Sequence, residues 1–231
     1  MIHIGDRWGK KYDFMRVYVP FVLRYGIRFT HWSKHIEILK DPTMYDRPGF
    51  VPTAESVVFD VGSQYGDYAL LWEKRNQAVV YAFEALHKNY SEMQLDFALN
   101  RSSIQSVRTF VGNGNPVEFE NTGTMATRKE SLNPHVATMK IDDFVEGNGI
   151  TPQIVKIDVE GFEYEVLEGM YETLQVFRPK IIMETHSSEL RRKCSRFLED
   201  IGYKQWYEGR FTKGTDWMDE VVNLFFWEAY K

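Results

Sequence analysis

The sequence predicts an α/β fold, namely a doubly wound, mostly parallel, seven-stranded sheet preceded by a helical N-terminal extension. First, short apolar runs alternate with longer helical patterns from residue 57 to residue 201, as expected when strands and helices alternate in a parallel sheet. Second, the first apolar run leads into a glycine loop and a helical pattern, which is typical of the ligand-binding end of such a sheet. Third, two aromatic-rich runs near the C-terminus predict an antiparallel pair of strands.

The composition is that of an ordinary globular protein. The chain has 231 residues, of which 43% are hydrophobic and 26% are charged, so one domain can bury roughly 70–75% of its unfolded surface. The formal net charge is −5, whereas a protein that binds nucleic acid usually has an excess of basic residues, and we therefore expect no nucleic-acid partner. Cys194 is the single cysteine, which excludes an internal disulfide and a cysteine-rich metal site.

Association with a membrane is not expected either. The sequence has no run of 18 apolar residues, which a membrane-spanning helix would need. Charged residues interrupt the first stretch of the chain, so it lacks the cleavable apolar core of a signal peptide. These features predict a cytoplasmic protein, and they do not indicate its oligomeric state.

The predicted elements follow one another in a regular order. Strands of the main sheet are expected at residues 57–60, 78–84, 104–111, 154–158, 180–184, 203–207 and 221–227. Shorter strands are expected at 117–119 and 137–141, on either side of a polar loop at 121–134. Helices are expected to begin near residue 68 and to span 87–99, 142–148, 162–174 and 189–201. Glycine-containing stretches at 112–115 and 209–219 predict turns.

Residues 1–50 are predicted to form a helical cap or extension, and residues 51–231 a single globular domain. Residues 12–25 are rich in aromatic and aliphatic side chains and predict one or two amphipathic helices broken by a proline. The segment could cover the ligand end of the sheet and shape a substrate pocket, or it could pack on a sheet face. His31 and His35 have the spacing of helical metal ligands, but no acidic or cysteine partner is near them in the sequence.

The loop after the first strand predicts a site for a nucleoside-type ligand. Asp60 closes the strand, and Gly62 and Gly66 bracket a tight loop that lets a ligand lie against the backbone. A dinucleotide loop would read G-x-G-x-x-G, but the middle glycine is missing here, and Asp67 would repel a pyrophosphate. S-adenosylmethionine has no phosphate, and its sulfonium and ammonium groups suit an acidic loop. The alternative is an ordinary glycine turn.

Glu84 ends the second predicted strand, about 20 residues after the glycine loop. A carboxylate at this position can accept hydrogen bonds from both hydroxyls of a ribose. It favours a nucleoside ligand without choosing between S-adenosylmethionine and a dinucleotide. The alternative is a solvated strand end.

A second group of polar residues follows the later strands. Lys156-Ile-Asp-Val-Glu-Gly161 and Met183-Glu-Thr-His186 should meet if both follow adjacent strands, because parallel strands end at one edge of a sheet. Transfer of a methyl group to oxygen requires alignment of the acceptor and removal of its proton. Asp158 and His186 are the candidate bases, and the imidazole has the more suitable intrinsic pKa of about 6.5.

Each of these residues also has a purely structural interpretation. Asp158 could cap the following helix, His186 could be a surface or core histidine, and Glu160 could belong to a turn. Alternatively, carboxylates in this region could bind a divalent cation, the candidates being Asp142, Asp158, Glu160 and Glu184. Because the sequence cannot show that these carboxylates converge, no metal ligand is predicted.

These motifs, in this order and spacing, resemble the FkbM-type methyltransferase family. The similarity covers residues 57–187 and rests on the D-x-G-x-x-x-G loop, Ala82-Phe-Glu-Ala85, Asn100, the K-I-D-V-E-G block, Val166-Leu-Glu-Gly169 and Met183-Glu-Thr-His186. The resemblance implies a Rossmann-like class I fold, S-adenosylmethionine as cofactor, and O-methylation of sugars or secondary metabolites. We therefore expect the methyl acceptor to be a hydroxyl of a small molecule or a glycan.

The resemblance also implies a set of site residues. The methionine moiety would lie along Asp60, Gly62 and Gly66, the ribose on Glu84 and the adenine on Asn113. The predicted cofactor-binding set is completed by Ser63, Gln64, Tyr65 and Ala85. The predicted catalytic set, near the acceptor, is Asp158, Glu160, Glu184 and His186. The chain departs from the usual family pattern at Ser63-Gln64, where Ala-Asn is common, and at Ala85, where proline is common.

Two other functions compete with a methyltransferase. A nucleotide-binding oxidoreductase is opposed by the missing glycine and by Asp67. A non-catalytic binding or scaffold protein on the same fold is opposed by the retained Asp60, Glu84, Asp158 and His186. Binding of S-adenosylmethionine, of NAD or of neither ligand would discriminate among the three.

Overall fold

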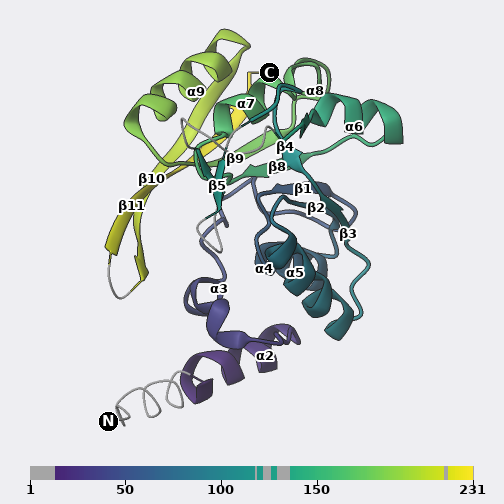
Figure 1. The fold of residues 1–231 in the computed structure, drawn as a ribbon. Coiled ribbons are helices and arrows are strands. Elements are labelled where there is room, and N and C mark those ends of the chain that lie inside the picture. Colours follow the sequence, from purple (N-terminus) through teal and green to yellow (C-terminus); the bar gives the residue numbers. More distant parts are fainter. Residues whose placement is uncertain (1–13, 118, 122–125, 129–135, 216–217, 231) are drawn as a thin grey trace.

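The computed structural model describes residues 14–117, 119–121, 126–128, 136–215 and 218–230. Its centre is a seven-stranded sheet with the strand order β10-β11-β9-β8-β1-β2-β3 (Figure 1). The strands are β1 (Val57–Val61), β2 (Val79–Glu84), β3 (Gln105–Arg108), β8 (Ile154–Ile157), β9 (Lys180–Thr185), β10 (Tyr203–Thr215) and β11 (Met218–Ala229). β11 runs opposite to the other six strands of this sheet, so it pairs antiparallel with both β10 and β9, and the remaining pairs are parallel. The predicted fold class is confirmed.

Helices cover both faces of this sheet (Figure 1). They are α4 (Asp67–Asn76), α5 (His87–Leu99), α6 (Ile141–Asn148), α7 (Glu163–Glu168), α8 (Tyr171–Phe177) and α9 (Ser188–Asp200). Successive side chains of a strand point to opposite faces, and this alternation divides the core into two clusters. Val58 belongs to the cluster under α4 and α5, whereas Phe59 belongs to the cluster under α6 to α9.

The N-terminal segment, residues 14–50, packs into the core on the α4 and α5 face. It contains a π-helical turn, Phe14–Tyr18, then α2 (Val19–Tyr25) and α3 (Ile36–Lys40). Its buried side chains share one cluster with the sheet, and they are Phe21, Ile27, Phe29, Ile38, Leu39, Tyr45 and Phe50. The helical prediction for residues 12–25 is therefore confirmed from residue 14 onward, and Pro20 lies in the first turn of α2, where proline is tolerated.

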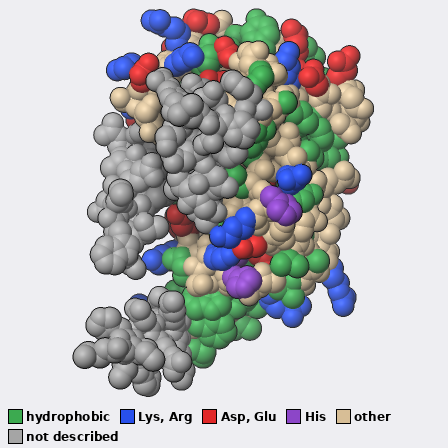
Figure 2. All heavy atoms as spheres, in the orientation of Figure 1, with side chains coloured by type: hydrophobic (Ala, Val, Ile, Leu, Met, Phe, Trp, Pro, Cys, Tyr) green, Lys and Arg blue, Asp and Glu red, His purple; other side chains and the backbone are tan. Residues whose placement is uncertain are grey.

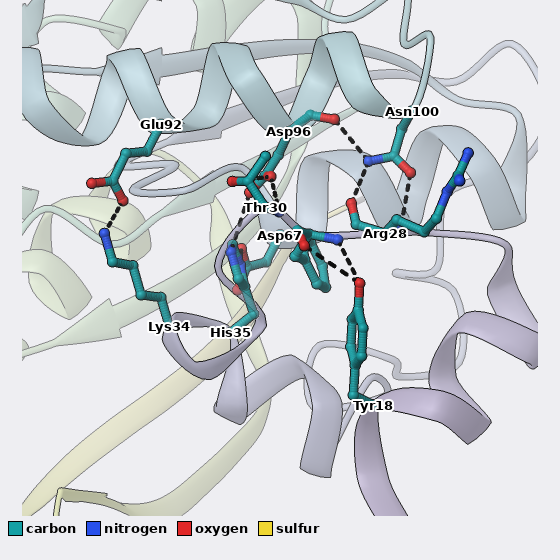
Figure 3. Close-up of polar contacts among 10 residues, drawn as sticks. Tyr18, Arg28, Thr30, Lys34, His35, Asp67, Glu92, Asp96 and Asn100 are labelled. Atoms are coloured by element: carbon teal, nitrogen blue, oxygen red, sulfur yellow. Dashed lines mark hydrogen bonds and ion pairs between the residues drawn. The ribbon is translucent and has the colours of Figure 1, made fainter. Parts of the chain in front are cut away.

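A buried histidine joins this segment to the two helices beneath it (Figure 3). His35 stacks on Phe29, and its two ring nitrogens face Asp67 at the start of α4 and Asp96 on α5. Burial disfavours the charged imidazolium, but the charges and hydrogen bonds of Asp67 and Asp96 outweigh burial and raise the pKa of His35 to about 9. The acidic partners that the sequence seemed to lack are thus supplied from distant elements, while His31 is exposed.

Two predicted elements are each divided in the structure. The strand predicted at 104–111 ends early, and after Thr109 the chain enters β4 (Phe110–Val111), which pairs with β7 (Thr138–Met139) outside the main sheet. The helix predicted at 162–174 is interrupted between α7 and α8. A Cβ on Gly169 would lie 1.9 Å from the carbonyl oxygen of Gly112, so only glycine permits this close approach.

The C-terminal hairpin is longer than the sequence predicts. The turn predicted at 209–219 is wrong for most of its length, because β10 extends to Thr215 and β11 begins at Met218. The loop predicted at 121–134 contains β6 (Ala126–Arg128), which pairs with β5 (Phe119–Asn121). The rest of that loop, 122–125 and 129–134, lies outside the described residues.

Candidate active site

The order β9-β8-β1-β2 brings the polar ends of four strands to one edge of the sheet. These strands are parallel and adjacent, and the carboxyl ends of such strands form the usual ligand-binding edge. The predicted site residues at or just after these ends are Asp60, Glu84, Asp158, Glu160, Glu184 and His186. The expected convergence of the two motifs is therefore present.

The loop between β1 and α4 is held against the end of β2. The backbone N–H groups of Gly62 and Ser63 both donate to the carbonyl of Phe83 at 3.0 Å. Gly62 has φ +81°, and a Cβ there would lie 1.7 Å from the carbonyl oxygen of Asp158. Gly62 thus allows the chain segments after β1 and after β8 to touch. Gly66, also at positive φ, is the N-cap residue that directly precedes α4.

Tyr65 is buried in this loop beneath the N-terminal segment. Its ring lies 5.6 Å from the ring of His35, edge to face, and the Lys34 ammonium lies 5.5 Å from its centroid. Ser63 is also buried, and its hydroxyl donates to the carbonyl of Asp60. These two predicted cofactor residues therefore support the shape of the loop, while Gln64 is exposed at its tip.

Glu84 is buried at the end of β2 and is hydrogen-bonded to the loop between β1 and α4. Its carboxylate accepts the backbone N–H of Gln64 at 2.9 Å and that of Leu86 at 2.8 Å. Burial outweighs these hydrogen bonds and raises the pKa of Glu84 to about 7. Asn89 also donates to Glu84 Oε1, at 3.4 Å. Each carboxylate oxygen has two lone-pair sites, so the remaining acceptor capacity lies on Oε2 and can take one hydroxyl of a ribose. Ala85 follows it, half-buried.

The replacement Glu84→Gln should weaken binding of S-adenosylmethionine by about 10- to 150-fold, or roughly 1.5–3 kcal/mol, because hydrogen bonds to a charged acceptor are lost. Wild-type affinity should also fall as the pH is lowered through about 7, since protonation removes the same charge. Isothermal titration calorimetry from pH 6 to pH 8.5 measures both effects. The exposed control Glu172→Gln should keep wild-type affinity, and an unchanged affinity in Glu84→Gln would remove Glu84 from the ribose site.

Asp60 is engaged by a buried lysine from the neighbouring strand. The Lys156 ammonium lies 3.1 Å from Asp60 Oδ1, and it donates to the carbonyl of Gly62 at 3.2 Å. Burial disfavours the ammonium, but the charges of Asp60 and Asp158 outweigh burial and raise the pKa of Lys156. From the sequence, Lys156 is notable only as the first residue of the K-I-D-V-E-G block. The structure shows it as the cation that ties β8 to the loop.

His186 lies among three carboxylates just after β9. Its Nδ1 is 2.7 Å from Glu163 Oε1, and its Nε2 is 3.3 Å from Glu160 Oε2 and 3.5 Å from Asp158 Oδ1. Burial disfavours the imidazolium, but the hydrogen bond to Glu163 and the three charges raise the pKa of His186 to about 10. The sequence-based choice of His186 as a base assumed its ordinary pKa. With no other cation beside it, the imidazole would be protonated at neutral pH, and a protonated imidazole cannot act as the base.

Tyr45 reaches the same edge from the N-terminal segment. Its hydroxyl donates a hydrogen bond to Glu184 at the end of β9, and the Lys156 ammonium lies 5.7 Å from its ring. Burial and the charge of Glu184 raise the pKa of Tyr45 well above its ordinary value. No pattern in the sequence indicates a role for Tyr45, because it lies in a turn-rich stretch without periodicity. Its position shows that the N-terminal segment contributes a side chain to the site.

Two residues considered from the sequence have other partners in the structure. Asn113 donates to Glu168 at the end of α7, and its predicted contact with adenine stays a prediction. Asp142 accepts hydrogen bonds from the backbone of Glu172 and from Thr173 at the start of α8. The idea that Asp142 belongs to an acidic cluster with Asp158 is therefore wrong, because its carboxylate caps a helix.

The sheet order, the single antiparallel strand and the carboxylates at the ends of β1 and β2 define a Rossmann-like methyltransferase fold. The family model for the methyltransferase FkbM domain matches residues 60–207. The chain belongs to this family.

One curated relative is the hexuronic acid methyltransferase AglP of Haloferax volcanii. It is 26% identical over 152 residues, which cover 63% of this chain and 62% of the relative. The match thus spans less than two thirds of that protein. Within the described part of the chain, no helix combines the length and the apolar character needed to cross a membrane.

Solved structures share the fold at low sequence identity. Methyltransferase FkbM from Methylobacillus flagellatus has a TM-score of 0.55 and 19% identity, covering 79% of this chain and 47% of that one. A methyltransferase from Pyrococcus furiosus has a TM-score of 0.52 and 12% identity, covering 96% and 99%. A putative tRNA (m1A22) methyltransferase from Streptococcus pneumoniae, in complex with S-adenosyl-L-methionine, has a TM-score of 0.52 and 16% identity, covering 78% and 68%.

Proposed function

We propose that this protein uses S-adenosylmethionine to methylate a hydroxyl group of a glycan or a small hydroxylated molecule. The observation that carries the proposal is the position of Asp158. Its carboxylate lies at the ligand edge of the sheet, its backbone carbonyl approaches Gly62 of the cofactor loop, and Glu84 lies on the adjoining side of that loop. A candidate base would thereby lie beside the proposed nucleoside site.

The residues at this edge fit the cofactor. Glu84 is a buried carboxylate whose Oε2 can accept a hydrogen bond from a ribose hydroxyl, and the Gly62–Gly66 loop offers backbone close to it. The carboxylates of Asp60, Asp158 and Glu160 gather at this edge beside Lys156 and His186, and such acidic surroundings suit a ligand with sulfonium and ammonium groups. When bound, S-adenosylmethionine would supply an electrophilic methyl group.

The chain's own part in the reaction is to hold the acceptor and take its proton. Asp158 would accept the proton of the attacking hydroxyl, because its carboxylate lies at the ligand edge of the sheet and its side chain is 14% exposed. His186, when protonated, would stabilise that carboxylate from 3.5 Å. Glu160 and Glu184 flank the same place and would bind further hydroxyls of the acceptor.

The similarity to a hexuronic acid methyltransferase supports a sugar acid as the acceptor class. A nucleic-acid substrate is not favoured, although one structural neighbour is a putative tRNA methyltransferase. The net charge is −5, and on the face shown in Figure 2 basic side chains are interspersed with acidic ones. A polyanion would need a continuous basic surface.

The variant Asp158→Asn should lower turnover by at least about 10²-fold, the usual contribution of a general base, while binding of S-adenosylmethionine stays within threefold of wild type. Methyl transfer from labelled cofactor to a panel of hexuronic acid glycosides measures the first quantity, and calorimetry measures the second. The exposed control Asp143→Asn should match wild type in both. Undiminished turnover would remove Asp158 as the base, and binding of NAD instead of S-adenosylmethionine would overturn the proposal.

A further inference from the structure

His186 Nε2 is a buried polar atom with an unusual environment. The side chain is only 9% exposed, and Nε2 has no hydrogen-bond partner among the described residues. It lies 3.5 Å from one oxygen of Asp158 and 3.3 Å from one oxygen of Glu160. One ligand atom from each of the three side chains lies within 4.8 Å of the other two. A nitrogen and two carboxylate oxygens are thus close enough together to share one cation.

The two separations from His186 Nε2 match those of ligands around one cation. With metal–ligand distances of about 2.1 Å, neighbouring ligand atoms are about 3.0 Å apart in an octahedron and about 3.4 Å apart in a tetrahedron. The separations from Nε2 are 3.3 and 3.5 Å. The Lys156 ammonium lies near the other oxygen of Asp158, Oδ2, at 3.8 Å, so it is not paired with the oxygen that lies near His186.

The second nitrogen of His186 is fixed by a carboxylate that does not face this point. Glu163 Oε1 lies 2.7 Å from Nδ1, and the Glu163 side chain is fully buried. Metal-bound histidines usually donate their other ring N–H to a carboxylate in this way, which fixes the tautomer and the ring orientation. By accepting the Nδ1 proton, Glu163 would leave the lone pair of the neutral imidazole on Nε2, the nitrogen that lies near Asp158 and Glu160.

We propose that Asp158, Glu160 and His186 bind a divalent transition-metal cation, with Glu163 orienting the imidazole. One nitrogen and two carboxylate oxygens suit Mn²⁺ or a similar ion better than Ca²⁺, which prefers oxygen ligands alone. The Asp158 and Glu160 side chains are 14% and 22% exposed, so the ion would have a path to solvent. Its open coordination positions would take oxygen atoms of the acceptor, and this last point rests on the proposed function.

The alternative occupant of the same place is a proton on Nε2, which would hold the two carboxylates as an imidazolium. A metal titration distinguishes the two occupants. A cation site binds metal with a defined stoichiometry that depends on all three ligands, whereas an imidazolium among carboxylates binds none.

The test uses the full chain, stripped of metal with a chelator and titrated with Mn²⁺ at pH 7.5, with electron paramagnetic resonance and calorimetry as readouts. We expect one ion per chain, binding at least 100-fold weaker in His186→Gln and in Glu160→Gln, and 10- to 100-fold weaker in Glu163→Gln. The exposed controls His87→Gln and Glu172→Gln should keep wild-type affinity. Circular dichroism checks that each variant is folded, and Glu160→Gln alters only a partly exposed loop side chain.

Absence of stoichiometric binding, or binding that His186→Gln and Glu160→Gln leave unchanged, would overturn the metal site. Binding of S-adenosylmethionine is measured on the same samples. If the cofactor binds and Mn²⁺ does not, the metal inference fails while the proposed function stands. If Mn²⁺ binds and the cofactor does not, the proposed function fails and the site remains.

Discussion

The replacement Lys156→Met is expected to lower the free energy of unfolding by about 3–5 kcal/mol, which is the usual effect of removing one partner from a buried ion pair. Asp60 and Lys156 are 1% and 4% exposed, so the remaining Asp60 carboxylate could not recover its hydration. The loop would also lose the hydrogen bond from Lys156 to the carbonyl of Gly62. Urea unfolding at pH 7 measures the change.

A double variant separates charge from packing in this pair. Combining Lys156→Met with Asp60→Asn should restore part of the lost stability, because the second change removes the unpaired charge. The surface control Lys204→Met breaks an exposed pair with Glu228 and should cost less than about 1 kcal/mol. Equal losses in the two lysine variants would show that burial of the Asp60–Lys156 pair contributes nothing.

Protonated His35 is expected to contribute roughly 3 kcal/mol to stability below pH 6.5, since its pKa is about 9 in the fold and about 6.5 in the unfolded chain. A raised pKa means that the folded state binds the proton more tightly. The contribution is therefore complete below pH 6.5 and is lost as the pH rises through 9. The titratable side chains that face the His35 ring are Asp67, Asp96 and Tyr65.

Comparing wild type with His35→Gln isolates this term from other titrating groups. The stability difference between the two proteins should be largest near pH 6 and should shrink by roughly 3 kcal/mol by pH 9.5, as measured by urea unfolding at a series of pH values. The exposed control His31→Gln should show no such trend. A difference that is independent of pH would mean that folding does not raise the pKa of His35.

The parts of the fold that the sequence predicts well are those with local signals. β1, β2, β8 and β9 are continuous apolar runs, and α5 and α9 have helical periodicity with recognisable ends. The predicted boundaries of strands and helices are wrong where a contact with a residue distant in the sequence decides where the element ends. The break at Gly169 depends on the carbonyl of Gly112, which is remote in the sequence, and no local pattern reports such an approach.

The site follows the same distinction. Carboxylates at strand ends could be placed from the sequence, because the strand order of a doubly wound sheet brings those ends together. Lys156 lies inside an apolar strand, and Tyr45 lies in an irregular stretch, so neither pattern indicates an ionic or hydrogen-bonded role. The pKa of His186 depends on three side chains whose convergence only the folded chain provides.

The packing of Phe50 has a consequence for how the chain folds during synthesis. Its ring lies 5.1 Å from that of Phe226 on β11, so two residues far apart in the sequence pack against each other. Contacts between such distant residues are slow to form because a long loop must close first. Phe50 must therefore remain without this contact until β11 has left the ribosome. During that interval its apolar ring is open to binding by a chaperone or to aggregation.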